Sequence, residues 1–126
     1  MDKLHAVFIK NNFSLNLETS KAIEYEHINS KEIVYLLHNK EISIVLNPNM
    51  VEKVSLLTSD KKYHSTALKK FPTRKNNGGN PIHYGYSYKF KQASDLDDFL
   101  NDLLYVTTRS DYHGETDSPR VEQPSI

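Results

Sequence analysis

The sequence predicts an α+β fold, in which a small antiparallel sheet of four to five strands packs against a C-terminal helix and a short N-terminal helix. Residues 13–46 alternate between apolar and polar side chains and are rich in β-branched residues, which is typical of strands. Residues 94–106 instead carry an apolar stripe at helical spacing. The chain has 126 residues, 37% of them hydrophobic, which fits one globular domain.

The N-terminal helix is predicted from apolar residues that recur at helical spacing between Leu4 and Phe8. Asp2 is a suitable N-cap for it, and Asn11-Asn12 is expected to end it. The helix should therefore have two or three turns.

A meander of three or four strands is expected between Phe13 and Leu46. Its best-defined part is a hairpin that pairs Glu32–His38 with Glu41–Leu46 through a two-residue connection, Asn39-Lys40, in which Asn tolerates positive φ. Ile33–Leu37 is apolar on both faces, so it should be a central strand.

The second half of the chain is expected to contain two helices and one long strand. Asn47-Pro48-Asn49 should close the meander as a turn before a short helix around Val51–Leu57. Ile82–Phe90 alternates along its whole length and reads as a strand. The C-terminal helix follows, with Ser94 as the expected N-cap.

We expect one α+β domain in residues 1–107, followed by a polar and disordered tail in residues 108–126, because the tail lacks periodicity and has few apolar residues. The chain contains no cysteine, which fits a reducing compartment. Its first residues resemble neither a signal peptide nor a membrane span. These features predict a cytoplasmic protein with no membrane association.

The distribution of charge is the main functional clue. The overall formal charge is zero, but residues 61–91 contain eight basic side chains and no acid, while the rest of the chain has eight basic and sixteen acidic side chains. Such a segment is expected to form a positive face that attracts nucleic acid or an acidic protein surface. The candidate anion-binding residues are Lys61, Lys62, Lys69, Lys70, Arg74, Lys75, Tyr84, Lys89 and Lys91.

Tyr84 is included because the strand Ile82–Phe90 places five apolar or aromatic side chains on one face. Either this face packs on the C-terminal helix, or tyrosines near its start stay exposed as platforms on which bases stack. The preceding loop is rich in Asn and Gly but is not a phosphate-binding P-loop, because Asn80 and Pro81 follow Gly79 where Lys and Ser or Thr are required. We expect no small-molecule cofactor.

The six histidines show no spacing that indicates a metal site, and the acids at the start of the C-terminal helix suit its dipole better than a metal ion. His64 and His83 both lie in the basic segment. Two imidazoles beside a lysine could serve as acid and base in cleaving RNA without a metal.

Three functions remain open from the sequence. The preferred one is a non-enzymatic binding protein that uses the basic, Tyr-rich residues 61–91 to dock on nucleic acid or on a nucleic-acid-handling protein. The first alternative is a small inhibitor, immunity or counter-defence protein that binds a protein target. The second alternative is a metal-independent ribonuclease that uses His64 and His83.

Overall fold

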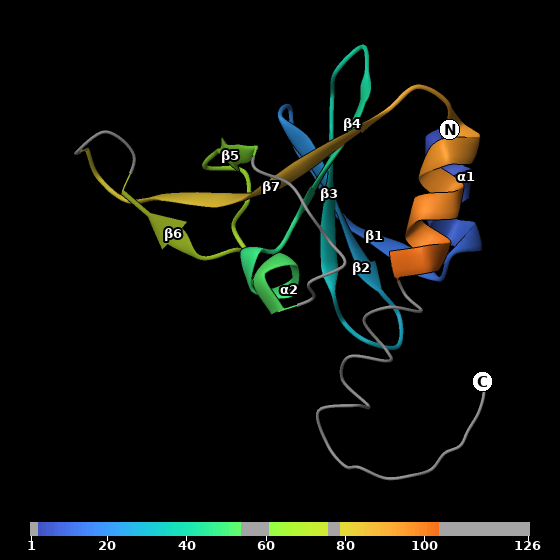
Figure 1. Ribbon diagram of the computed structural model, residues 1–126, viewed down its shortest axis with the longest axis horizontal. Coiled ribbons are helices and arrows are strands. Elements are labelled where there is room, and N and C mark those ends of the chain that lie inside the picture. The colour runs from blue at the N-terminus through green and yellow to red at the C-terminus, as the bar shows by residue number, and fades with distance from the viewer. Residues whose placement is uncertain (1–2, 54–60, 76–78, 104–126) are drawn as a thin grey trace, which may run out of the picture.

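The computed structural model describes residues 3–53, 61–75 and 79–103. The chain begins with a helix and continues as a meander of four strands: α1 (Lys3–Lys10), β1 (Phe13–Glu18), β2 (Ala22–His27), β3 (Ile33–Leu37) and β4 (Ile42–Leu46). It then forms α2 (Pro48–Lys53), β5 (Lys62–His64), β6 (Thr73–Arg74), β7 (Ile82–Phe90) and a C-terminal helix described over residues 93–103, drawn in orange in Figure 1.

The described strands form one antiparallel sheet in the order β1-β2-β3-β4-β7-β5, with β6 paired to β7. The predicted α+β architecture with two terminal helices is confirmed. The sheet has seven strands among the described residues rather than four to five. The additional strands, β5 and β6, have three and two residues, too few to produce a periodic pattern in the sequence.

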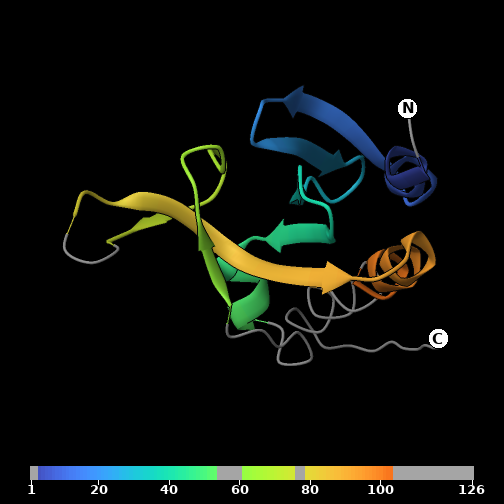
Figure 2. The same ribbon diagram turned by 90° about the horizontal axis from the view of Figure 1, so that it is seen from above.

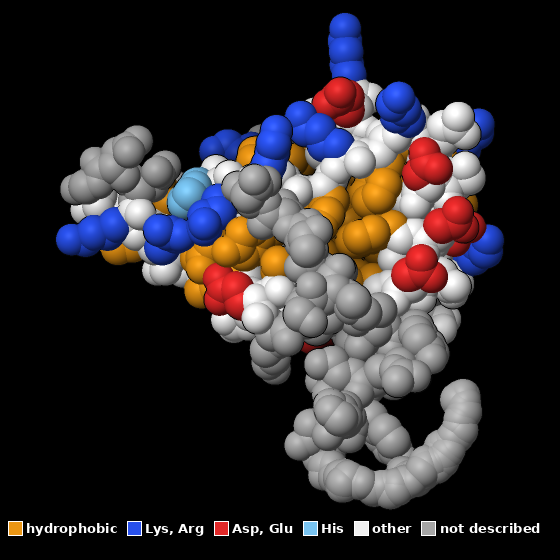
Figure 3. All heavy atoms as spheres, in the orientation of Figure 1, with side chains coloured by type: hydrophobic (Ala, Val, Ile, Leu, Met, Phe, Trp, Pro, Cys, Tyr) orange, Lys and Arg blue, Asp and Glu red, His pale blue; other side chains and the backbone are white. Residues whose placement is uncertain are grey.

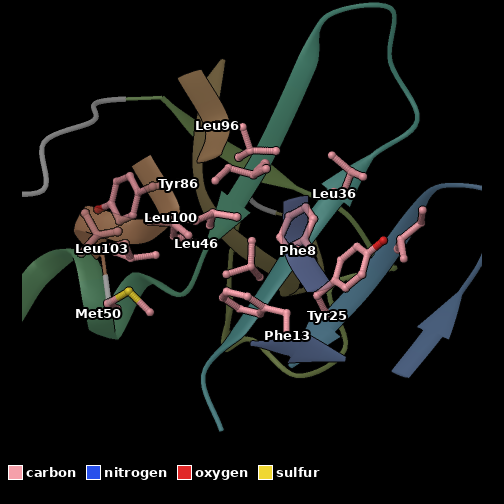
Figure 4. Packing of buried hydrophobic residues seen from close by; sticks show 14 residues of the cluster. Phe8, Phe13, Tyr25, Leu36, Leu46, Met50, Tyr86, Leu96, Leu100 and Leu103 are labelled. Atoms are coloured by element: carbon pink, nitrogen blue, oxygen red, sulfur yellow. The ribbon is translucent and has the colours of Figure 1, made fainter. Parts of the chain in front are cut away.

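The helices cover one face of the sheet, and a loop covers the other. On the helical face, Phe8, Met50 and Leu100 bring α1, α2 and the C-terminal helix into one core (Figure 4). On the opposite face, Leu68 and Phe71 from the segment between β5 and β6 form a smaller core. Because β3 contributes to both cores, its prediction as a central strand is confirmed.

The predicted hairpin is present, but the prediction that two residues connect its strands is wrong. Val34 lies opposite Leu46 and Leu36 opposite Ile44, so four residues, 38–41, separate the paired strands. Asn39 is not among the described residues with positive φ, and a two-residue turn of the expected type requires that conformation. Positive φ occurs instead at Lys31, at the end of the loop between β2 and β3.

Both later helices begin before their predicted first residues. Asn47 is the N-cap of α2, since its side-chain oxygen accepts the Asn49 N–H at 2.9 Å and Pro48 occupies the first helical position. The C-terminal helix begins at residue 93 rather than after Ser94. Its Asp95 carboxylate accepts the Gln92 N–H at 3.2 Å, as in one half of a capping box.

The two ends of the described chain are tied together beside the sheet (Figure 1). Lys10 pairs with Asp97 of the C-terminal helix at 2.6 Å, and the Asn11 side chain donates to the same carboxylate at 2.9 Å. Asn12 ends α1 in the predicted place with φ of 68°. The Asp2 cap, the boundary at residue 107 and the predicted tail lie outside the described residues.

In the described parts of the chain, none of the helices combines the length and apolar composition needed to cross a membrane.

Gly85 is the point at which β7 approaches its neighbours most closely. A Cβ atom at this position would lie 2.5 Å from Val45 Cγ1, 2.6 Å from the Leu46 carbonyl oxygen and 3.0 Å from the Phe71 ring. The carbonyl belongs to the backbone of β4 and cannot move without disturbing the sheet. Glycine at this position therefore allows β7 to pack between β4 and the Phe71 loop.

We predict that Gly85→Ala lowers the free energy of unfolding by about 1–3 kcal/mol, because the added methyl group overpacks the site. Denaturant unfolding followed by circular dichroism measures the change. Ser87→Ala, two residues along the same strand, is the matched control and should have a smaller effect. Equal losses in the two variants would contradict the packing argument.

Candidate functional site

The first half of β7 extends beyond the main sheet and carries two short strands. Residues 86–90 of β7 pair with β4, whereas residues 84–86 pair with β5 and residues 82–83 with β6. Figure 2 shows this part projecting away from the two terminal helices. We call β5, β6 and residues 82–86 of β7 the arm.

One face of the arm brings together cations and aromatic rings from all three strands. Across β5 and β7, Lys62 lies opposite Tyr86 and His64 opposite Tyr84. The Lys62 ammonium is 5.4 Å from the centre of the Tyr86 ring, within cation–π range. The arm face is defined here as Lys62, His64, Arg74, Tyr84 and Tyr86.

Tyr84 lies between His64 and Arg74. The Ser65 N–H donates to the His83 carbonyl, whereas the Tyr84 N–H donates to the Pro72 carbonyl, so β5 and β6 occupy opposite edges of β7. The His64 and Tyr84 rings stack with their centres 5.7 Å apart and their planes 24° apart. The Arg74 guanidinium carbon is 5.4 Å from the centre of the Tyr84 ring.

Tyr86 anchors the arm face to the core. Its ring is buried, and its hydroxyl donates to the Glu52 carboxylate of α2 at 3.1 Å. Burial and the neighbouring Glu52 raise the pKa of Tyr86, whereas the positive charge of Arg74 acts in the opposite direction. Glu52 is thus an acidic group at the margin of the otherwise basic arm face.

The two halves of the aromatic face of β7 differ in what they contact. Tyr88 and Phe90 each lie 5.2 Å from Phe99, ring centre to ring centre, so the second half of the face packs on the C-terminal helix. Tyr84 remains half-buried on the arm, outside that contact.

The structure brings together only part of the predicted anion-binding set. Lys62, Arg74 and Tyr84 share the arm face, and Lys75 follows Arg74 as another exposed cation. Lys61 and Lys69 are exposed beside the arm. In Figure 3 several basic side chains lie over the arm and others lie along the upper edge and at the side of the C-terminal helix, along which acidic side chains also lie.

Other members of the set lie elsewhere. Lys89 pairs with Glu41 at 3.2 Å in an exposed ion pair. Lys91 follows the far end of β7 and lines a surface hollow with Lys3 of α1. At about 3.3 Å per residue, the length of β7 separates Lys91 from the Arg74 end of the arm by about 30 Å.

Lys70 is held by a buried carboxylate that the sequence analysis did not identify. Its ammonium lies 2.7 Å from Glu24, whose side chain is 4% exposed. Glu24 also accepts hydrogen bonds from the Tyr35 hydroxyl at 2.8 Å and from Asn16 at 3.1 Å. The Lys70 N–H donates to the same Tyr35 hydroxyl, so backbone and side chain both fasten the loop to the sheet.

Burial by itself would raise the pKa of Glu24, but the hydrogen bonds from Lys70, Asn16 and Tyr35 outweigh it and hold the pKa below its ordinary value. The ionised carboxylate is therefore the form that the folded protein favours. We call Glu24, Tyr35 and Lys70 the carboxylate latch.

The two candidate catalytic histidines point to opposite faces of the arm. His64 stacks on Tyr84, whereas His83 precedes Tyr84 along β7, and its Nδ1 lies 2.7 Å from the Phe71 carbonyl oxygen. His64 Nε2 is enclosed and has no hydrogen-bond partner within the described residues. The structure does not bring these imidazoles together as an acid–base pair.

Residues 3–53, 61–75 and 79–103 contain no group of three or more His, Asp or Glu side chains arranged to hold a metal ion. Among known proteins, no family model matches the chain, and the curated proteins contain no significant relative.

We predict that acid weakens the fold through the carboxylate latch. Because the folded state lowers the pKa of Glu24 below 4.5, ionised Glu24 stabilises the protein above that pH, and the contribution disappears as the pH falls through the lowered pKa. Glu24→Gln should lower the free energy of unfolding at neutral pH by about 1–3 kcal/mol. When the pH is lowered, the free energy of unfolding of this variant should fall by less than that of the wild type. Unfolding curves measured across this pH range provide the test.

Glu41→Gln is the matched control, because it removes a carboxylate from the exposed pair with Lys89. Exposed pairs contribute little, so its stability should stay within about 0.5 kcal/mol of the wild type at every pH. The same acid dependence in wild type and Glu24→Gln would show that the latch does not supply it.

Proposed function

We propose that this chain is a non-enzymatic nucleic-acid-binding protein and that the arm is its binding surface. The observation that carries the proposal is the grouping of Lys62, Arg74 and Tyr84 on one face of three adjoining strands. Exposed cations supply the phosphate contacts that dominate affinity for nucleic acid, and aromatic rings beside them suit contacts with bases.

The charge distribution supports the same surface. The eight basic residues of the segment 61–91 include six between Lys61 and Lys75, all of which lie on or beside the arm. Lys70 is committed to the carboxylate latch, whereas Lys62, Lys69, Arg74 and Lys75 are exposed where a polyanion could approach. A positive region at one end of an otherwise acidic protein also orients it during encounter.

The geometry gives less support to the ribonuclease alternative. General acid–base catalysis requires both imidazoles within reach of one phosphate, and His64 on β5 and His83 on β7 point to opposite faces of the arm. A binding protein needs no such pair.

We predict that Arg74→Glu combined with Lys75→Glu weakens binding to DNA and RNA of every sequence. Each neutralised phosphate contributes about −0.7 to −0.9 to the slope of log affinity against log salt concentration, so losing two contacts should flatten the slope by about 1.4 to 1.8. Fluorescence anisotropy with labelled oligonucleotides over a salt series measures both quantities.

Lys3→Glu combined with Lys91→Glu is the matched control, because it makes the same change in net charge at the far end of β7. Charges beyond about 10 Å are largely screened at 0.1 M salt, so this variant should retain most of the affinity. Equal weakening by both variants would place the binding surface elsewhere. If the wild type binds neither DNA nor RNA at about 50 mM salt, the proposal fails and an acidic protein becomes the partner to test.

A further inference from the structure

The arm face contains a stack of three side chains whose outer member is exposed. The order across the strands is His64 from β5, Tyr84 from β7 and Arg74 from β6. Arg74 is exposed, while Tyr84 and His64 beneath it are half-buried. The stack therefore presents a guanidinium group to solvent with aromatic rings supporting it.

Core packing does not account for this arrangement. Within the described residues, Tyr84 belongs to neither hydrophobic core, although Tyr86 and Tyr88 on the same face of β7 belong to or pack against the larger one. Tyr84 instead meets Tyr86 edge-on, with ring centres 6.4 Å apart. His64 and Tyr86 thus both contact the Tyr84 ring, over which Arg74 lies.

The Arg74 guanidinium lies over the Tyr84 ring, 5.4 Å from its centre, and is exposed, so a second planar group can approach it from solvent. Nucleic-acid bases stack on arginine planes as they do on aromatic rings, and the edge of the guanidinium can still donate hydrogen bonds to phosphate. In a duplex the faces of the bases are covered by their neighbours in the stack. A single strand exposes them.

We infer that the arm selects single-stranded over double-stranded nucleic acid by stacking a base on Arg74, which Tyr84 and His64 hold in place. This inference rests on the proposed function and adds the class of ligand. Lys75 and Lys62 then supply phosphate contacts that do not depend on strand form. Stacking distinguishes single-stranded from double-stranded nucleic acid, whereas the positive charge attracts both forms.

The experiment compares three probes of equal length: a labelled oligothymidine strand, a DNA duplex, and a single strand made of abasic sites. The full chain should bind oligothymidine about tenfold more tightly than the abasic strand, which carries the phosphates without bases. Arg74→Lys retains the charge but removes the planar group. It should reduce affinity for oligothymidine about tenfold and leave the other two affinities unchanged.

Lys75→Gln is the matched control, because it removes an adjacent charge and should weaken binding to all three probes alike. Tyr84→Leu removes the support beneath Arg74 and should reproduce the selective loss seen with Arg74→Lys. Unchanged duplex affinity shows that the Leu variant remains folded.

The inference is overturned if Arg74→Lys weakens binding to all three probes equally or to none. If the wild type nevertheless binds the probes with the expected salt dependence, the proposed function stands and only the inference of base stacking on Arg74 is excluded. If the wild type binds no probe, both proposals fall.

Discussion

The structure depends on one strand that serves two parts of the molecule. The second half of β7 pairs with β4 and packs against the C-terminal helix, while its first half is the spine of the arm. Gly85 lies at the junction, where its missing side chain admits Val45 and Phe71. A well-packed core thereby fixes the direction in which the arm projects. The positions of the exposed side chains on the arm depend on the packing of the buried residues beside them.

Much of the main sheet and its helices follows from local patterns. Ile33–Leu37 was predicted to be central because it is apolar on both faces, and the two cores on either side of β3 explain that composition. The turn between β3 and β4 was less predictable, since Asn39 permits positive φ without requiring it. The first turns of both later helices were misplaced because Asn47-Pro48-Asn49 was read as a turn and Ser94 as an N-cap.

The candidate site was predictable in composition but not in arrangement. The charge count identified Lys62, Arg74 and Lys89 equally as candidate anion-binding residues. Only the strand pairing shows that Lys62 and Arg74 lie on the arm and that Lys89 lies near the other end of β7. The burial of Glu24 could not be predicted from the sequence, because the alternating pattern of β2 suggests that this acid faces solvent. It is buried because the loop carrying Lys70 folds over it, a contact between segments that are far apart in the sequence.

The connectivity of the sheet also orders its assembly. The first four strands pair with their immediate neighbours in the chain, so they can form while the remainder is still unfolded. β7 must then close a long loop to place Phe90 opposite Ile42. Until it does, the exposed edge of β4 offers unpaired backbone groups to other chains. The strand that organises the arm is thus also one that we expect to join the sheet late, and until it does the edge of β4 is open to aggregation.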